Sequence, residues 1–193
     1  MTGTGFQIDL HRCVGCGACV LACRIENRRR GEAAWRRVLP LNLRRRHGGP
    51  TYFLSVACHH CEDPACLRGC PSRAYEKRPD GVVIHREERC LGCRYCEMTC
   101  PFGAPRYDED RGVVSKCHLC HHRLDNGLDP ACVAACPTEA LRVFRPESPP
   151  EDARSTVPGF SDPGTCRPAL RFLPPRGIRR EQWYRALEER LTR

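Results

Sequence analysis

The stretch CLGCRYCEMTCP, from Cys90 to Pro101, contains four cysteines in the spacing C-x-x-C-x-x-C-x-x-x-C-P. Three thiolates separated by two residues each can surround one [4Fe–4S] cubane from a tight loop. The fourth cysteine lies one helical turn beyond the third and points away from that loop. This stretch therefore predicts a loop whose first three thiolates ligate one cluster and whose last thiolate ligates another.

Three further groups resemble this one, and together the four groups use sixteen of the seventeen cysteines. Each group closes with a cysteine four residues after another, and the last three groups continue into Pro71, Pro101 and Pro137. In two-cluster ferredoxins the fourth cysteine ligates the other cluster, so groups work in pairs. Four groups of four thiolates predict four [4Fe–4S] clusters, and the groups are Cys13, Cys16, Cys19 and Cys23; Cys58, Cys61, Cys66 and Cys70; Cys90, Cys93, Cys96 and Cys100; and Cys117, Cys120, Cys132 and Cys136.

Disulfides and zinc are the competing uses of these cysteines. An odd cysteine count and an N-terminus, MTGTGFQIDLHRC, without a secretory pattern argue against disulfides. Zinc is the stronger alternative, because CHHC at 58–61 and CHLCHH at 117–122 mix cysteine with histidine. A zinc-stabilised interaction module without redox activity thus stays open, and iron and acid-labile sulfide analysis would distinguish it.

The formal charge of +9 and the arginine runs at 28–30 and 44–46 could indicate nucleic-acid binding. Four oxidised clusters with their thiolates would contribute about −8, which leaves a nearly neutral protein. No aromatic residues interleave the arginine runs. We therefore expect no nucleic-acid partner, and the absence of an apolar run of about twenty residues predicts no direct membrane span.

Short strands are expected beside the cysteine groups and a helix at 18–28, which gives an α+β fold. Trp35 is expected to pack on a cluster loop. From Arg145 onward the sequence is proline-rich, which predicts an extended tail ending in a helix that docks a partner. Cys166 lies in this tail and is interpreted as an unligated thiol. The expected strands are Gly5–Asp9, Tyr52–Val56, Val82–His85, Val113–Ser115 and Leu141–Phe144.

The segments CHHCEDPACLRGCPSRAYEKRPDGVV at 58–83 and CLGCRYCEMTCPFGAPRYD at 90–108 strongly resemble the four-cluster iron–sulfur subunit of the dimethyl sulfoxide reductase and polysulfide reductase family of molybdopterin oxidoreductases. The resemblance covers about Gly5 to Phe144 and extends to CRPALRFLPP at 166–175. It implies two interleaved ferredoxin-like units, one inserted in the other. Residues 1–51 plus 111–145 would form the outer unit, 52–110 the inserted unit, and 146–193 the tail.

The resemblance also implies which groups pair, a choice that the spacing alone leaves open. The first group would pair with the fourth, and the second with the third. The four ligand sets implied are Cys13, Cys16, Cys19 and Cys136; Cys117, Cys120, Cys132 and Cys23; Cys58, Cys61, Cys66 and Cys100; and Cys90, Cys93, Cys96 and Cys70.

A cubane with four cysteine ligands has no open iron, so no catalytic site of its own is expected. Basic neighbours of the cysteines would favour the reduced clusters: Arg12, Arg24, Arg89, Arg94 and Lys116. The resemblance implies an electron-transfer subunit that connects a large catalytic subunit, with molybdenum or tungsten on its pterin, to an integral-membrane, quinone-reactive subunit. A polyferredoxin subunit of a hydrogenase or formate-hydrogen lyase is the alternative. The protein would be peripheral to the cytoplasmic membrane through its partner, on either face, and substrate and direction of electron flow stay open.

Overall fold

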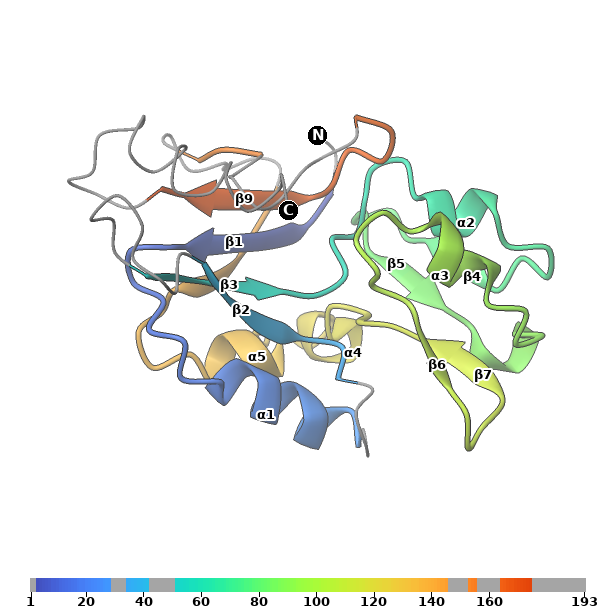
Figure 1. The fold of residues 1–193 in the computed structure, drawn as a ribbon, viewed down its shortest axis with the longest axis horizontal. Coiled ribbons are helices and arrows are strands. Elements are labelled where there is room, and N and C mark those ends of the chain that lie inside the picture. Colours follow the sequence, from blue (N-terminus) through green and yellow to red (C-terminus); the bar gives the residue numbers. More distant parts are fainter. Residues whose placement is uncertain (1–2, 29–33, 42–50, 146–152, 156–163, 175–193) are drawn as a thin grey trace.

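The computed structural model describes residues 3–28, 34–41, 51–145, 153–155 and 164–174. Its elements are short, and the segments that bear cysteines separate them (Figure 1). In chain order they are β1 (Gly5–Asp9), α1 (Ala18–Glu26), β2 (Arg37–Leu41), β3 (Tyr52–Val56), α2 (Ala65–Arg68), β4 (Tyr75–Lys77), β5 (Val83–His85), a 3₁₀ turn (Glu87–Arg89), α3 (Tyr95–Thr99), β6 (Arg106–Asp108), β7 (Val113–Ser115), α4 (His121–Leu124), α5 (Ala131–Ala134), β8 (Leu141–Phe144) and β9 (Leu170–Leu173).

A three-stranded sheet in the order β8-β1-β9 joins the two ends of the described residues. Strand β1 pairs antiparallel with β8 and parallel with β9, and its alternate residues Phe6 and Ile8 are buried. Gly5 permits this close approach, because a Cβ added there would lie 1.9 Å from the carbonyl oxygen of Ala169. A central strand position therefore explains why β1 carries glycine at its start.

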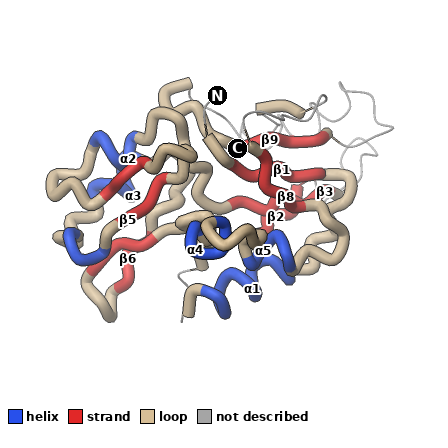
Figure 2. The backbone as a smooth tube through the Cα atoms, turned by 180° about the vertical axis from the view of Figure 1, so that it is seen from behind, coloured by secondary structure: helices blue, strands red, loops and turns tan. Residues whose placement is uncertain are grey.

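Three two-stranded antiparallel ladders, β2-β3, β4-β5 and β6-β7, complete the strand pairing. Figure 1 shows two lobes: the three-stranded sheet with β2, β3, α1 and α5, and a smaller lobe with α2, α3 and β4 to β7. The same separation is visible from behind (Figure 2). Within the lobes α1 packs against α5, and α2 packs against α3.

The apolar core is divided in the same way. The larger cluster of buried residues includes Phe6, Ile8, Leu54 and Phe172, together with several cysteines. The smaller cluster contains only five buried residues, and two of them are cysteines: Cys66, Tyr75, Val83, Cys96 and Val114. Side chains of cysteine thus replace aliphatic side chains through much of the interior.

The expected strands agree closely with the structure, and the expected helix at 18–28 ends two residues early, at Glu26. Trp35 packs as expected, because its ring lies 5.2 Å from that of His118 on the loop after Cys117, and its Nε1 donates to Ser115 Oγ at 3.1 Å. The tail differs from the expectation in one respect, because Leu170–Leu173 forms β9, which pairs with β1 in the three-stranded sheet. The expected C-terminal helix lies outside the described residues. No helix in the described part of the protein is long and apolar enough to cross a membrane.

Candidate metal centres

Three cavities in the structure each have four cysteines from two groups in their lining. Site 1 is lined by Cys13, Cys16, Cys19 and Cys136 and encloses about 370 Å³ of non-protein space. Site 3 is of similar size, about 370 Å³, and its lining includes Cys58, Cys61, Cys66 and Cys100. Site 4 encloses about 260 Å³ and its lining includes Cys70, Cys90, Cys93 and Cys96.

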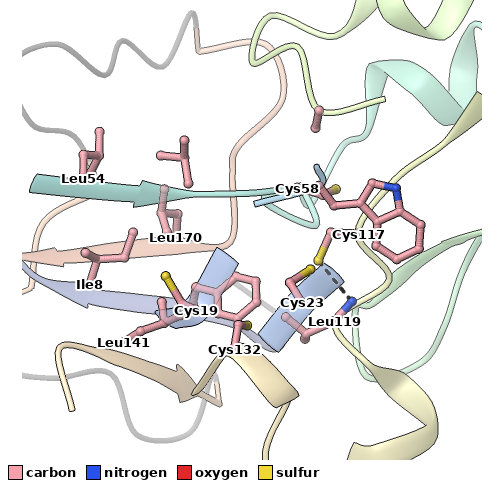
Figure 3. Close-up of a cluster of buried hydrophobic side chains, with 14 of the residues drawn as sticks. Ile8, Cys19, Cys23, Leu54, Cys58, Cys117, Leu119, Cys132, Leu141 and Leu170 are labelled. Atoms are coloured by element: carbon pink, nitrogen blue, oxygen red, sulfur yellow. Dashed lines mark hydrogen bonds between the residues drawn. The ribbon is translucent and has the colours of Figure 1, made fainter. Parts of the chain in front are cut away.

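The remaining four cysteines, Cys23, Cys117, Cys120 and Cys132, gather between α1, α4 and α5 and are called site 2. Burial raises the pKa of Cys117, and the nearby thiols of Cys23 and Cys58 raise it further. Burial likewise raises the pKa of Cys23 to about 12, with Cys132 as the next cause. Figure 3 shows the sulfur atoms of Cys23 and Cys117 turned toward one another. All four cysteines of site 2 are buried, whereas each of the other sets includes partly or fully exposed cysteines.

These four sets coincide with the ligand sets that the family resemblance implies. Their ligation of clusters stays a prediction, but the chemistry of the donors can be compared with zinc. A tetrahedral zinc ion with Zn–S bonds of about 2.3 Å needs its sulfurs within about 4 Å of one another. Sites 1, 3 and 4 instead surround cavities of about 260–370 Å³, which is more space than a single ion between four sulfurs leaves. Four cysteines around a cavity of this kind fit a cubane, which occupies the space between its four ligands.

The backbone explains how each loop turns its thiols inward. Two residues after the first cysteine of every group, the backbone takes a left-handed conformation, with φ between 45° and 73°. Glycine meets this requirement without strain at Gly15 and Gly92. The same conformation falls on His60 and Leu119 in the other two groups, so the loop geometry repeats even where glycine does not.

Shared secondary structure places the sites in a row. Helix α1 carries Cys19 of site 1 and Cys23 of site 2, one turn apart. Helix α5 repeats this with Cys132 of site 2, four residues before Cys136 of site 1. In the smaller lobe Cys66 and Cys96 lie on α2 and α3, each four residues before a cysteine of the other site. Site 1 therefore lies beside site 2, and site 3 beside site 4, because the same helices carry cysteines of both.

His60 connects the two pairs of sites. It lies between Cys58 and Cys61 of site 3, is 1% exposed, and accepts a hydrogen bond at Nδ1 from the Val83 amide at 3.0 Å. A neutral imidazole that accepts at Nδ1 carries its proton on Nε2. That Nε2 lies 4.0 Å from Cys117 Sγ of site 2, so it donates to the sulfur. Burial lowers the pKa of His60 well below its usual value, which keeps the ring neutral.

Two buried cations lie among the thiols, and only one of them was expected. Lys116 lines site 3, and its ammonium donates to the carbonyls of Val83 and, at 3.0 Å, Cys117. Arg36 is 1% exposed; burial lowers its pKa, but four thiols of sites 1 and 2 outweigh burial and raise it. Sequence reasoning missed Arg36, because it lies in the long segment between the first two groups, where no motif marks it.

The other expected basic neighbours, Arg12, Arg24, Arg89 and Arg94, are exposed. Arg12 lies 3.6 Å from Glu139, and Arg94 lies 2.6 Å from Glu97. Water and acidic partners screen such charges, so their effect on a buried site is weak. Arg36 and Lys116 differ from these four arginines because they are buried. The sequence does not indicate which cations become buried.

The cysteines before Pro71 and Pro137 have a common local environment. Burial opposes ionisation of Cys70, but the Ser72 hydroxyl at 3.5 Å and neighbouring backbone N–H groups outweigh it and lower its pKa. The pKa of Cys136 is lowered against burial in the same way, by backbone N–H groups and the Thr138 hydroxyl at 3.8 Å. The hydroxyl two residues after the cysteine is the sequence signal that could have identified this feature.

Comparison with known proteins agrees with this chemistry. A family model described as a 4Fe-4S dicluster domain matches residues 50–145, and one described as a 4Fe-4S binding domain matches residues 6–26. The protein is 44% identical over 153 residues to a polypeptide of the anaerobic dimethyl sulfoxide reductase of Escherichia coli K12, covering 72% of each.

Three further relatives extend the comparison. A putative dimethyl sulfoxide reductase iron-sulfur subunit of Halobacterium salinarum is 37% identical, over 75% of this protein and 66% of the relative. A subunit of the tetrathionate reductase of Salmonella typhimurium is 39% identical, over 67% of this protein and 52% of the relative. The arsenate respiratory reductase iron-sulfur subunit of a Shewanella species is 29% identical, over 85% of this protein and 90% of the relative. This protein therefore carries multiple [4Fe–4S] clusters and belongs to the family of iron–sulfur subunits that serve dimethyl sulfoxide reductase and related reductases.

Proposed function

We propose that this protein relays single electrons through four [4Fe–4S] clusters, from or to a molybdopterin catalytic subunit on one side and a quinone-linked membrane anchor subunit on the other. The observation that carries the proposal is the row of four cysteine sets, linked in pairs by α1 and α5 and by α2 and α3. When bound, [4Fe–4S] clusters exchange one electron at a time with little rearrangement. The polypeptide itself holds the sites at fixed separations, excludes water from site 2 and supplies the buried charges.

The two ends of the row carry exposed apolar side chains, which favour docking of protein partners. At site 1 Cys16 is exposed, and Val14, which also lines the cavity, is 59% exposed. At site 4 Cys93 is exposed, and Leu91, which also lines the cavity, is 74% exposed. Electron entry and exit at opposite ends would use these two surfaces. The protein would then be peripheral to the cytoplasmic membrane through the anchor.

The same arrangement supports two ferredoxin-like units, one inserted in the other. Residues 1–51 plus 111–145 would hold sites 1 and 2, and residues 52–110 would hold the thiols of sites 3 and 4. The relatives are subunits of sulfoxide, tetrathionate and arsenate reductases by name, and do not favour the hydrogenase alternative.

The proposed ligand pairing is tested by alanine variants of single cysteines in the full-length protein. Cys13→Ala and Cys136→Ala should remove the same paramagnetic component, because both thiols belong to site 1. Cys132→Ala should remove a different component, although Cys132 is closer in sequence to Cys136. Electron paramagnetic resonance of dithionite-reduced protein and iron analysis provide the readout. Loss of one common component from Cys132→Ala and Cys136→Ala would refute the pairing.

The function is tested by composition and by association. Anaerobically purified protein should contain about sixteen irons and as many acid-labile sulfides, as four cubanes require. The native assembly should contain a large pterin-bearing polypeptide and an integral-membrane polypeptide. Zinc in place of iron would exclude a redox role, and a full iron content with a nickel hydrogenase as the partner would favour the alternative.

A further inference from the structure

The seventeenth cysteine, Cys166, lies in the wall of site 3. It is 1% exposed and lines the same cavity as Cys58, Cys61, Cys66 and Cys100. Its effect on the neighbouring thiols is consistent with this position: burial raises the pKa of Cys61, and Cys166 is among the thiols that raise it further. Five thiols therefore face a cavity whose cluster would use four.

The segment that carries Cys166 is held against the site 3 loop by main-chain hydrogen bonds. The amides of Glu62 and Asp63 donate to the carbonyls of Arg167 and Cys166 at 2.8 and 3.1 Å. The Ala169 amide donates to the carbonyl of His59 at 2.9 Å. Strand β9 begins four residues after Cys166 and pairs with β1. The position of the thiol is thus fixed on both sides.

Two neighbouring residues complete the surroundings of the thiol. The Thr165 hydroxyl lies 3.7 Å from Cys166 Sγ and can donate to it, which leaves the S–H of Cys166 available to the cavity. Arg167 Nε lies 3.2 Å from Glu62 Oε2, and the Arg167 backbone is left-handed, with φ of 44°. An arginine adopts this conformation at some cost, and the hydrogen bonds on either side of it offset that cost. The local backbone is therefore shaped to turn Cys166 inward and Arg167 outward.

We propose that Cys166 is a non-ligating thiol that donates its S–H to the sulfur atoms of site 3 and raises the reduction potential of the cluster held there. The proposal rests on the proposed function, because it needs a cluster in site 3. A cubane with four thiolate ligands is anionic, so a fifth ionised thiol beside it would be repelled. A protonated thiol instead donates a hydrogen bond, and hydrogen bonds to cluster sulfur favour the reduced form, which carries more negative charge.

Two substitutions at Cys166 separate hydrogen bonding from ligation. Cys166→Ala removes the donor, and Cys166→Ser keeps a hydroxyl donor of similar size. Both variants should retain the iron and sulfide content of the wild type. In potentiometric titrations followed by electron paramagnetic resonance, Cys166→Ala should lower the potential of one component. The expected change in its reduced-to-oxidised ratio is about tenfold, equivalent to about 59 mV for one electron. Cys166→Ser should stay near the wild-type potential.

Ser72→Ala is the matched control, because it removes a hydroxyl 3.5 Å from Cys70 Sγ of site 4. It should shift a component other than the one that Cys166→Ala shifts. Unchanged potentials in Cys166→Ala would overturn the proposal, as would the loss of about a quarter of the iron in both Cys166 variants, which would make Cys166 a ligand. Absence of the cluster on which the proposal rests is distinguishable, since it would appear as an iron deficit in the wild type, and a different partner of the protein would leave the Cys166 result unchanged.

Discussion

Removal of the clusters is expected to unfold the smaller lobe, between about residues 65 and 115. Its buried apolar cluster contains three residues besides two cysteines, Tyr75, Val83 and Val114. Burying a large apolar side chain contributes about 1.5–3 kcal/mol. Val82, Ile84 and Ala104 of the same segment are buried in the larger cluster. Fixing the backbone of each residue costs about 1–2 kcal/mol, so even these six side chains cannot hold about fifty residues. Metal binding must supply the difference, as it does in small metal-dependent domains.

Hydrogen exchange measures this effect residue by residue. The protein would be treated anaerobically with an oxidant and an iron chelator, and the amides of β4 and β5 followed before and after. Protection of these amides should disappear with the iron, and the far-ultraviolet circular dichroism should fall. The sheet β8-β1-β9 is the internal comparison, because Phe6, Leu170 and Phe172 are buried there and are absent from the lining of the site 1 cavity. Native protection of β4 and β5 in iron-free protein would show that the thin core suffices.

The sequence predicted the local structure well, because cysteine spacing constrains the loops directly. The strands beside the groups were expected at nearly their observed bounds, and the four left-handed loop positions follow from a repeated spacing. The pairing of groups had to come from family resemblance. A spacing of C-x-x-C-x-x-C describes one loop, whereas the partner of its fourth thiol depends on contacts far apart in the sequence.

Contacts between distant segments also explain what the sequence did not indicate. Cys166 was interpreted as an isolated thiol of an extended tail, yet β9 pairs with β1 and brings it to site 3. Arg36 was hidden in a stretch with many arginines, and only the fold distinguishes it from the exposed ones. Sequence patterns report local periodicity and ligand type, and neither reveals which of many similar charges becomes buried.

Replacement of Arg36 by methionine is expected to have the largest effect of any substitution outside the cysteines. The Nη1 of Arg36 donates to Ser55 Oγ at 3.0 Å, and the guanidinium lies 4.3 Å above the Phe6 ring. Its Nε and Nη2 atoms are buried and have no hydrogen-bond partner among the described residues. Buried donors without partners are costly, so their orientation among four thiols of sites 1 and 2 is explained by anionic clusters there.

Methionine has a similar volume but no charge, so Arg36→Met leaves two anionic sites without their buried counter-charge. Breaking a buried charge pair in this way costs about 3–5 kcal/mol. Release of iron from the oxidised protein should therefore accelerate by at least about a hundredfold, since each tenfold change corresponds to about 1.4 kcal/mol. Two of the four paramagnetic components should also move to lower potential, because reduction adds a further negative charge.

Two control variants, Arg36→Lys and Arg94→Met, test whether the effect comes from the buried charge. Arg36→Lys keeps the charge and loses the planar contact with Phe6, so its iron release should lie between those of the wild type and Arg36→Met. Arg94 is exposed beside site 4 and paired with Glu97, so its loss should change iron release by less than about twofold, as expected for a screened surface charge. Equal iron release from Arg36→Met and Arg94→Met would refute a role for the Arg36 charge in holding the clusters of sites 1 and 2.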